Sequence, residues 1–197
     1  MTKLNQTYST DLKYTEWQQI AEFFPTLQMG RPPKWEKWQV INAILYVNRT
    51  GCQWRMLPVN FPPWRTVYFY YWSWQRDGVW QRINDVLVKK VRKQAGRHER
   101  PSAAVIDSQS VKTSEGGEER GVDVHKQTPG RKRHLVVDVL GLVLLVVVHS
   151  ASIQDGAGGL LTLQTLFDHI KHNLHNRWCR LKLIWADGGY PSIMDVV

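Results

Sequence analysis

The chain has 197 residues, a formal net charge of +9 and two cysteines. It has no apolar run of about eighteen residues and no signal-peptide core at its start, which argues against a membrane or secreted protein and predicts a soluble cytoplasmic one. Cys52 and Cys179 lie far apart and neither has a CxxC partner, so the sequence also argues against a zinc centre.

The charge is distributed unevenly along the chain. Residues 1–100 hold sixteen Lys and Arg against seven Asp and Glu, whereas the remainder holds ten of each, and eight of the ten tryptophans lie in the first half. This change of composition predicts a boundary near residue 100, between a helical domain over 15–98 and a second domain over 101–197. The polar residues 1–14 predict a disordered N-terminus. A basic module joined to one with paired acids indicates a nucleic-acid partner, and a merely solubilising surface is the alternative.

The first half predicts short helices joined by turns. Thr15 is the expected N-cap, with Gln18 in the capping-box position, of a helix that Pro25 ends. Gly51 and Gly96 are expected to end two later helices in a left-handed conformation. These two helices are expected over residues 34–50 and 79–95, and a further helix is expected over residues 65–76.

Basic side chains at the edges of these helices predict contacts with DNA phosphates. Short helices with basic edges are typical of helix-turn-helix DNA readers, and a small bundle that only docks on the second domain fits the same pattern. The candidate DNA-binding residues in this half are Arg49, Arg55, Arg65, Lys89, Lys90, Arg92 and Lys93.

The second half predicts a mixed α/β sheet. The expected elements are a strand over 103–111, a loop over 113–130, a hairpin of 135–139 with 142–149, a helix after 155 and a strand over 181–186. The second hairpin strand is apolar on both faces, so we expect it to be buried. Arg131, Lys132 and Arg133 form a basic cluster between loop and strand that suits phosphates. Asp155 is the expected helix N-cap, with a metal-ligand role as the alternative.

Two acids of this half are the candidate catalytic residues. Asp107 lies in the middle of the first predicted strand, where a buried carboxylate is costly unless it is paired or holds a metal. Asp187 directly follows the last predicted strand and precedes two glycines. If the two strands are neighbours, both acids can face one cation, and Mg²⁺ takes one or two carboxylates together with phosphate oxygens and water.

Several motifs resemble the insertion-sequence transposases of bacteria, and most closely the insertion-sequence-five family of DDE transposases. The resemblance runs from about residue 15 to the end of the chain. It is carried by Gly30-Arg-Pro-Pro33, Asn42-Ala-Ile-Leu-Tyr46, Arg49-Thr-Gly-Cys-Gln-Trp-Arg-Met-Leu-Pro58, Phe61-Pro-Pro-Trp-Arg-Thr-Val-Tyr68, Asp77-Gly-Val-Trp80, Ile106-Asp-Ser-Gln-Ser-Val-Lys112, Gly130-Arg-Lys-Arg-His134 and Ala186-Asp-Gly-Gly-Tyr190.

The resemblance implies a helical DNA-binding region followed by a ribonuclease-H-like catalytic fold. It implies that Asp107 and Asp187 are the first two acids of a metal site that holds two Mg²⁺ or Mn²⁺ ions and cuts and joins phosphodiesters. It also implies a bacterial, nucleoid-associated protein that binds the terminal inverted repeats of its element, in double-stranded DNA, as a homo-oligomer. Arg131, Lys132 and Arg133 are then expected near the phosphates.

The family's third acid, a Glu, has no match in this sequence, because no Glu follows Glu119. We therefore expect a C-terminally truncated transposase with an incomplete ribonuclease-H-like sheet, inactive when alone. The alternative is a DNA-binding regulator, or a decayed remnant, that occupies the element ends without cutting them.

Overall fold

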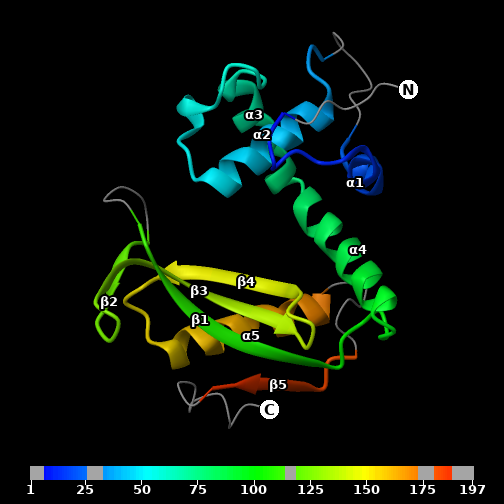
Figure 1. Cartoon of the computed structure of the whole chain (residues 1–197). Coiled ribbons are helices and arrows are strands. Elements are labelled where there is room, and N and C mark those ends of the chain that lie inside the picture. The colour runs from blue at the N-terminus through cyan, green and yellow to red at the C-terminus, as the bar shows by residue number, and fades with distance from the viewer. Residues whose placement is uncertain (1–6, 26–32, 114–118, 173–179, 188–197) are drawn as a thin grey trace. The chain divides into compact units, whose positions relative to one another are not determined.

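The computed structural model describes residues 7–25, 33–113, 119–172 and 180–187 (Figure 1). The chain forms two compact units, residues 1–84 and 85–197. The division falls inside helix α4, Val79–Gln94, whereas the change of composition near residue 100 comes after that helix has ended. The units are described one at a time.

The first unit is helical, as predicted. Its elements are α1 (Tyr14–Ile20), the 3₁₀ turn η1 (Ala21–Phe23), α2 (Lys37–Thr50), the 3₁₀ turn η2 (Trp54–Met56), α3 (Trp64–Arg76) and the beginning of α4. Residues 51–63 join α2 to α3, and the tight turn at Asp77 and Gly78 joins α3 to α4.

Two helices begin at positions other than those expected. The N-cap of α1 is Lys13 rather than Thr15, and the Lys13 N–H donates to Glu16 at 2.8 Å, so Glu16 takes the capping-box position expected for Gln18. In α2 the Glu36 N–H donates to the Gln39 side chain at 2.9 Å, which starts the helix at Lys37 instead of at residue 34. The sequence pattern located these helices but not their first turns.

The predicted helix ends are confirmed. Gly51 has φ 68° and Gly96 has φ 67°, both in the left-handed region that favours glycine. After Gly96 the Arg97 N–H donates to the Arg92 carbonyl at 2.9 Å, while the Gly96 N–H donates to Lys93 at 3.0 Å. This pair of bonds satisfies carbonyls at the end of α4.

The prediction of a disordered N-terminus is wrong for residues 7–14; residues 1–6 lie outside the described residues. The Asp11 carboxylate accepts the Thr7 and Tyr8 N–H groups at 2.8 and 2.9 Å. The Tyr8 ring stacks on Phe61 with centroids 4.9 Å apart. Tyr8 therefore attaches the start of the chain to the helical unit, a contact that its polar neighbours in the sequence gave no reason to expect.

An aromatic cluster forms much of the core of the helical unit. Trp74 of α3 is buried and its ring centroid lies 4.6 Å from Phe24, 5.1 Å from Tyr70 and 6.1 Å from Trp80. The buried side of α2, which includes Ile41 and Ile44, contributes the aliphatic part. Burial of these large side chains provides the main stabilisation of the unit.

The second unit holds a mixed sheet, which confirms the α/β prediction. Its elements are β1 (Ala103–Lys112), β2 (Gly121–Asp123), β3 (Thr128–Asp138), β4 (Val143–Ser150), α5 (Asp155–His172) and β5 (Leu183–Ala186). The central strand β1 pairs antiparallel with β3 and parallel with β5, and β3 also pairs with β2 and β4. The loop predicted over 113–130 is therefore wrong in its second half, where β2 and the first residues of β3 form a hairpin.

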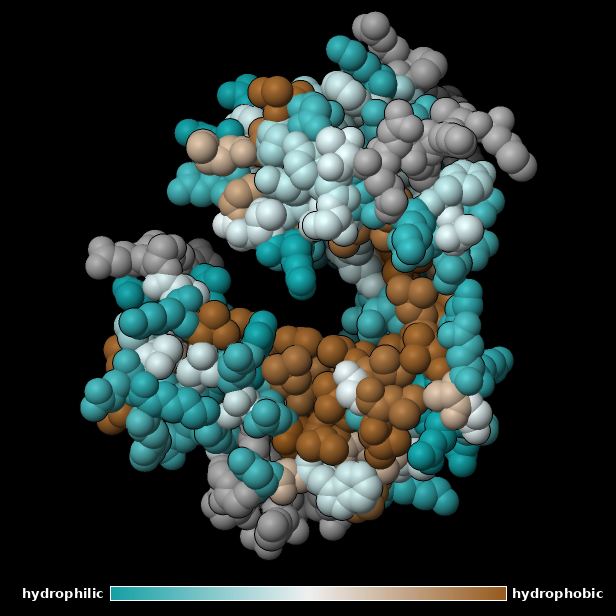
Figure 2. Space-filling view, in the orientation of Figure 1, coloured by the Kyte–Doolittle hydropathy of each residue, from teal (hydrophilic) through white to brown (hydrophobic). Residues whose placement is uncertain are grey.

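The two faces of this sheet differ sharply. Helix α5 lies on one face (Figure 1), where Leu163 and Leu166 pack with Ala104, Ile106 and Val136 in a buried core. The other face, here called the open face, exposes apolar side chains, and Figure 2 shows hydrophobic surface gathered over these strands. Val146 and Val148 of β4 are among them, so the prediction that both faces of β4 are buried is wrong.

Candidate catalytic site

Asp107 and Asp187 end up at equivalent places on neighbouring strands. In the parallel pairing of β1 with β5, Val105 lies opposite Trp185 and Ile106 opposite Ala186. Asp107 and Asp187 are the next residues along each strand, and neighbouring strands lie about 4.8 Å apart. The expectation that the two strands are neighbours is therefore met, and both carboxylates lie where they can face the same ligand.

Asp107 is exposed, so the argument that a buried carboxylate demands a partner does not apply to it. Strand alternation explains the position: Ala104 and Ile106 face α5, and Asp107 faces the open side. One Asp107 oxygen accepts the Ser108 N–H at 2.7 Å. Its carboxylate is open to solvent, as a metal-binding or catalytic side chain has to be.

Two of the three clustered basic residues share the open face with Asp107. Arg133 lies opposite Gln109 in the β1–β3 pairing, and its Nε donates to the Gln109 side chain at 2.9 Å. Arg131 lies two residues further along the same face. The cluster belongs to strand β3 itself and does not lie between a loop and a strand, as was predicted. Because side chains along a strand point alternately to its two faces, only some members of the cluster reach the solvent.

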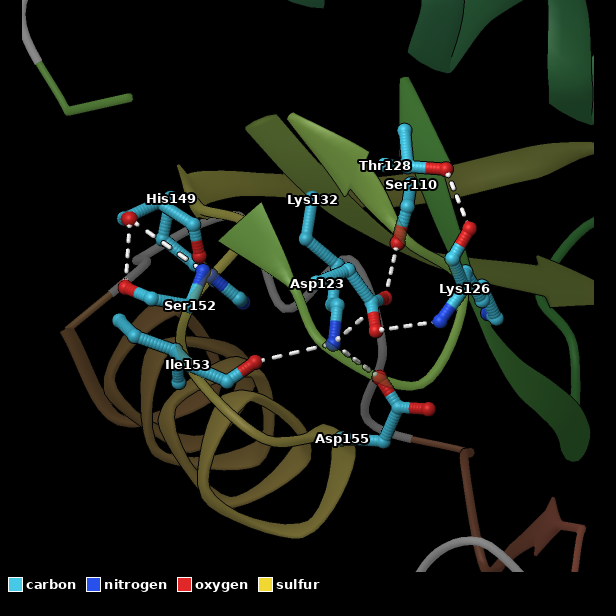
Figure 3. Close-up of polar contacts among 10 residues, drawn as sticks. Ser110, Asp123, Lys126, Thr128, Lys132, His149, Ser152, Ile153 and Asp155 are labelled. Atoms are coloured by element: carbon cyan, nitrogen blue, oxygen red, sulfur yellow. Dashed lines mark hydrogen bonds and ion pairs between the residues drawn. The ribbon is translucent and has the colours of Figure 1, made fainter. Parts of the chain in front are cut away.

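Lys132 points the other way and is buried, with 3% of its surface exposed. Figure 3 shows its ammonium group among three oxygens: Asp155 at 2.8 Å, the Ile153 carbonyl at 2.9 Å and Asp123 at 3.2 Å. The prediction that Lys132 contacts DNA phosphate is therefore wrong, because its charge is already neutralised inside the protein. Asp155 is the first residue of α5, not its N-cap, and it is ion-paired to Lys132.

The Asp123 carboxylate completes this buried cluster. The Ser110 hydroxyl donates to it, and this bond is the largest of the effects that hold the pKa of Asp123 well below its usual range. Burial opposes the shift, while the Lys126 N–H and Lys132 add to it. The sequence argument missed Asp123 and Ser110, although Ser110 lies three residues after Asp107 and so faces the opposite side of β1.

Arg92 is the second candidate DNA contact that the structure removes. It is 4% exposed and forms an ion pair with Asp138, and its Nε donates to the His98 carbonyl at 2.8 Å. The other candidates are not buried. Lys93 is exposed, although its ammonium group forms an ion pair with Glu99 at 2.8 Å. The remaining exposed or partly exposed candidates are Arg49, Arg55, Arg65, Lys89, Lys90, Arg131 and Arg133.

Two buried histidines, His134 and His149, lie near the buried ion pairs of Lys132. The rings of His134 and His149 have centroids 5.0 Å apart, and the His149 Nδ1 bonds to the Ser150 carbonyl at 2.8 Å. A Cβ added to Gly158 of α5 would overlap the Nε2 atoms of both rings. Gly158 is therefore the residue that lets α5 approach the sheet, a requirement that only the three-dimensional packing reveals.

Replacing Gly158 by Ala is expected to lower the free energy of unfolding by about 1–3 kcal/mol, because both imidazoles have to move to make room. Urea denaturation measures the change. Gly156→Ala, in the same first turn of α5, is the matched control and is expected to be close to neutral or stabilising. Equal losses for the two variants would contradict the packing described.

The stability of the protein is expected to fall between pH 7 and pH 5 because of His134. Burial, and then the neighbouring His149, lower the pKa of His134 to about 4. An unfolded His has a pKa near 6.5, so between these values the unfolded state binds more protons and stability rises with pH. The expected change is about 2 kcal/mol over this interval.

Urea denaturation at the two pH values tests this dependence. His134→Gln should remove most of the slope, while His125→Gln, at an exposed position, should leave it unchanged. Asp123 adds little here, because a carboxylate with a lowered pKa loses its contribution only as the pH falls below about 4. A slope that survives His134→Gln would assign the effect to another group.

Comparison with known proteins agrees with the fold. Residues 12–84 match the family described as "Putative transposase of IS4/5 family", and residues 98–196, just over half of the chain, match the family described as "Transposase DDE domain". The chain belongs to the DDE transposase family, whose domain implies a ribonuclease-H-like fold. Such domains typically use divalent metal ions.

A relative comes from an insertion element. The "Insertion element IS402 uncharacterized 16.2 kDa protein" of Burkholderia cepacia is 33% identical over 95 residues, which cover 45% of this chain and 57% of that protein. The chain thus spans little more than half the length of this relative. No solved structure matches the chain. Within the described residues, no helix combines the length and apolarity that crossing a membrane demands.

Proposed function

We propose that the chain is the DNA transposase of an insertion sequence, which binds the ends of its element and cuts and joins phosphodiesters. The observation that supports this most is the juxtaposition of Asp107 and Asp187 on the open face, with Arg133 two residues along the same face. Carboxylates beside an exposed guanidinium suit a metal-bridged phosphate, because Arg recognises phosphate oxygens with two parallel N–H groups.

The donor set on the open face fits a hard divalent cation. Within the described ranges no three His, Cys, Asp or Glu side chains form a cluster that holds a metal. Two carboxylates can hold one Mg²⁺ or Mn²⁺ ion, which completes its shell with water and phosphate oxygens. When bound, such ions lower the pKa of water and stabilise the charge that develops on the phosphate, with two ions in the complete site.

In this arrangement the residues of the chain have distinct tasks. Asp107 and Asp187 hold the metal from neighbouring strands, and Arg133 orients a phosphate beside them. Exposed cations of the helical unit, such as Arg49, Arg55 and Arg65, bind the phosphates of the double-stranded terminal repeats. The site acts on the element ends within an oligomer of this chain. The cell compartment that fits this function is the nucleoid region of a bacterial cytoplasm.

Asp107→Asn is expected to abolish metal binding at the open face and, in a chain supplied with the third acid that this sequence does not match, to suppress metal-dependent cleavage. Mn²⁺ binding is measured by calorimetry, and cleavage is measured on end-labelled DNA that carries the terminal repeats of the element. Loss of a metal ligand that stabilises the developing charge should reduce cleavage roughly a thousandfold. Asp187→Asn should act in the same way.

Asp168→Asn is the matched control, because Asp168 is an exposed carboxylate on α5, on the other side of the sheet. It should leave Mn²⁺ binding and cleavage unchanged. Binding of terminal-repeat DNA should survive all three substitutions. Mn²⁺ binding that is indifferent to both Asp107→Asn and Asp187→Asn would sink the proposed site.

A second candidate function is that of a DNA-binding regulator that occupies element ends without cutting them. It is favoured by the stretch of residues 37–76, which contains five Lys and Arg and no Asp or Glu. This function predicts binding of terminal-repeat DNA that weakens steeply with salt, since phosphate contacts release counterions. Salt-dependent binding together with no cleavage in Mg²⁺ or Mn²⁺, even after the third acid is supplied, would favour the regulator over the enzyme.

A further inference from the structure

Helix α3 exposes a stripe of aromatic side chains flanked by arginines, and the proposed function does not use its rings. Val67 and Trp74 are its buried residues, and on the opposite side the rings of Tyr68, Phe69 and Trp72 are 45%, 62% and 50% exposed. Trp72 lies three residues after Phe69 and four after Tyr68, which places its ring next to both along the helix. Arg65 and Arg76 stand at the two ends of this set, here called the α3 stripe: Arg65, Tyr68, Phe69, Trp72 and Arg76.

Neighbouring side chains hold several of these rings in place. Trp54 of η2 meets the Tyr68 ring edge-to-face, with centroids 5.4 Å apart. The Arg76 guanidinium lies 4.9 Å from the centroid of Trp72. At the other end of the helix, the Arg65 guanidinium lies 5.5 Å from the centroid of the Trp64 ring. Such contacts reduce the conformational freedom that a ligand would otherwise have to remove on binding.

The stretch of sequence that contains the α3 stripe carries charges of one sign as far as Arg76. No Asp or Glu occurs between Lys37 and Arg76, whereas Lys37, Arg49, Arg55, Arg65 and Arg76 all lie in this stretch. Asp77, just beyond α3, pairs with Arg76 at 3.2 Å at the exposed end of the helix. The surface therefore complements a polyanion, and a second copy of the same face would place Arg against Arg, which is unfavourable.

We infer that the α3 stripe binds single-stranded DNA, with unpaired bases stacked on Phe69 and Trp72 and the phosphates beside Arg65 and Arg76. The inference rests on the proposed function in taking DNA as the partner of the chain. Exposed ring faces gain little from duplex DNA, whose base faces are already covered by their neighbours. Unpaired bases stack on such rings whatever their sequence, and guanidinium groups bind the backbone beside them.

Fluorescence anisotropy with the full chain tests this inference. The probes are a fluorescein-labelled single strand of 20 mixed nucleotides and the same sequence as a duplex. The double variant Phe69→Ala/Trp72→Ala should weaken single-strand binding at least tenfold and duplex binding less than about twofold. Because both rings are exposed, the fold should survive, which circular dichroism and the unfolding temperature verify.

Two controls separate stacking from loss of bulk. Val59→Ala removes a fully exposed apolar side chain of the same unit and should change neither affinity. Phe69→Tyr/Trp72→Phe keeps a ring at each position and should retain most of the single-strand affinity. Single-strand affinity that is lost in the alanine variant and kept in the variant with two other rings shows that the rings stack on bases. A general loss of apolar surface would not give this pattern.

Three results would overturn the inference. The alanine variant could weaken both probes equally, weaken neither, or instead abolish self-association measured by sedimentation equilibrium. The last result would make the α3 stripe a protein interface. If only the inference about the α3 stripe is incorrect, the unmodified chain still binds the duplex probe. If DNA is not the partner of the chain, the unmodified chain binds neither probe. The two failures are therefore distinguishable.

Discussion

Lys132→Met is expected to lower the free energy of unfolding by about 3–5 kcal/mol. The substitution keeps the length of the side chain but leaves Asp123, which is 3% exposed, without its cation. It also removes the ion pair to Asp155 and the bond to the Ile153 carbonyl, so contacts of β3 with β2 and with the start of α5 are lost together. Urea denaturation at pH 7 measures the change.

Arg133→Met is the matched control, because Arg133 is the next residue on the same strand and faces solvent. We expect a change within about 0.5 kcal/mol. Adding Asp123→Asn to Lys132→Met should recover part of the loss, since it removes the uncompensated charge. If Lys132→Met and Arg133→Met proved equally mild, the buried position of Lys132 would be incorrect.

Arg92→Met is the second substitution with a large expected effect, again about 3–5 kcal/mol. Its partner Asp138 is 2% exposed, and one Asp138 oxygen accepts the N–H groups of Leu140 and Leu142, both at 2.9 Å. The other oxygen meets Arg92. Without the guanidinium, a buried charge at the β3–β4 turn is left unpaired, and α4 loses its polar link to the sheet.

Lys93→Met, the neighbouring position on α4, is the control for Arg92→Met. Its ion pair with Glu99 has 65% of the lysine side chain exposed, and surface pairs of this kind contribute about 0–1 kcal/mol. The combination Arg92→Met/Asp138→Asn should cost less than the sum of the single changes. Strict additivity would show that the two side chains do not depend on each other.

The sequence predicted the elements well because their signals are local. A short run of small and β-branched residues marked β1, and the glycines at 51 and 96 marked helix ends that the φ angles confirm. The boundaries that failed depend on individual hydrogen bonds, such as the Glu36 N–H to Gln39 bond that starts α2. The hairpin of β2 with β3 was missed because its polar residues gave no strand signal, and the partners of Asp123, such as Lys132, are known only from the fold.

The candidate site shows the same division between local and distant information. Asp107 and Asp187 could be singled out from their places in two short apolar runs, and the parallel pairing then placed the runs side by side. The three consecutive basic residues 131–133 looked equivalent in the sequence. Once β3 is known to extend over them, alternation sends Lys132 into the protein and its neighbours outward. That extension could not be inferred, because Gly130 and Pro129 disfavour a strand interior.

The brevity of β5 has a consequence for the lifetime of the site. β5 pairs with β1 over four residue positions, and it is an edge strand in the part of the sheet that the structure describes (Figure 1). Short edge segments open and close far more often than central strands, in local fluctuations that leave the rest of the fold intact. Asp107 stays on the rigid centre of the sheet, while Asp187 leaves it each time β5 frays. In the proposed site the two carboxylates would therefore come together only while β5 is paired, and a ligand that bridges them would prolong that interval.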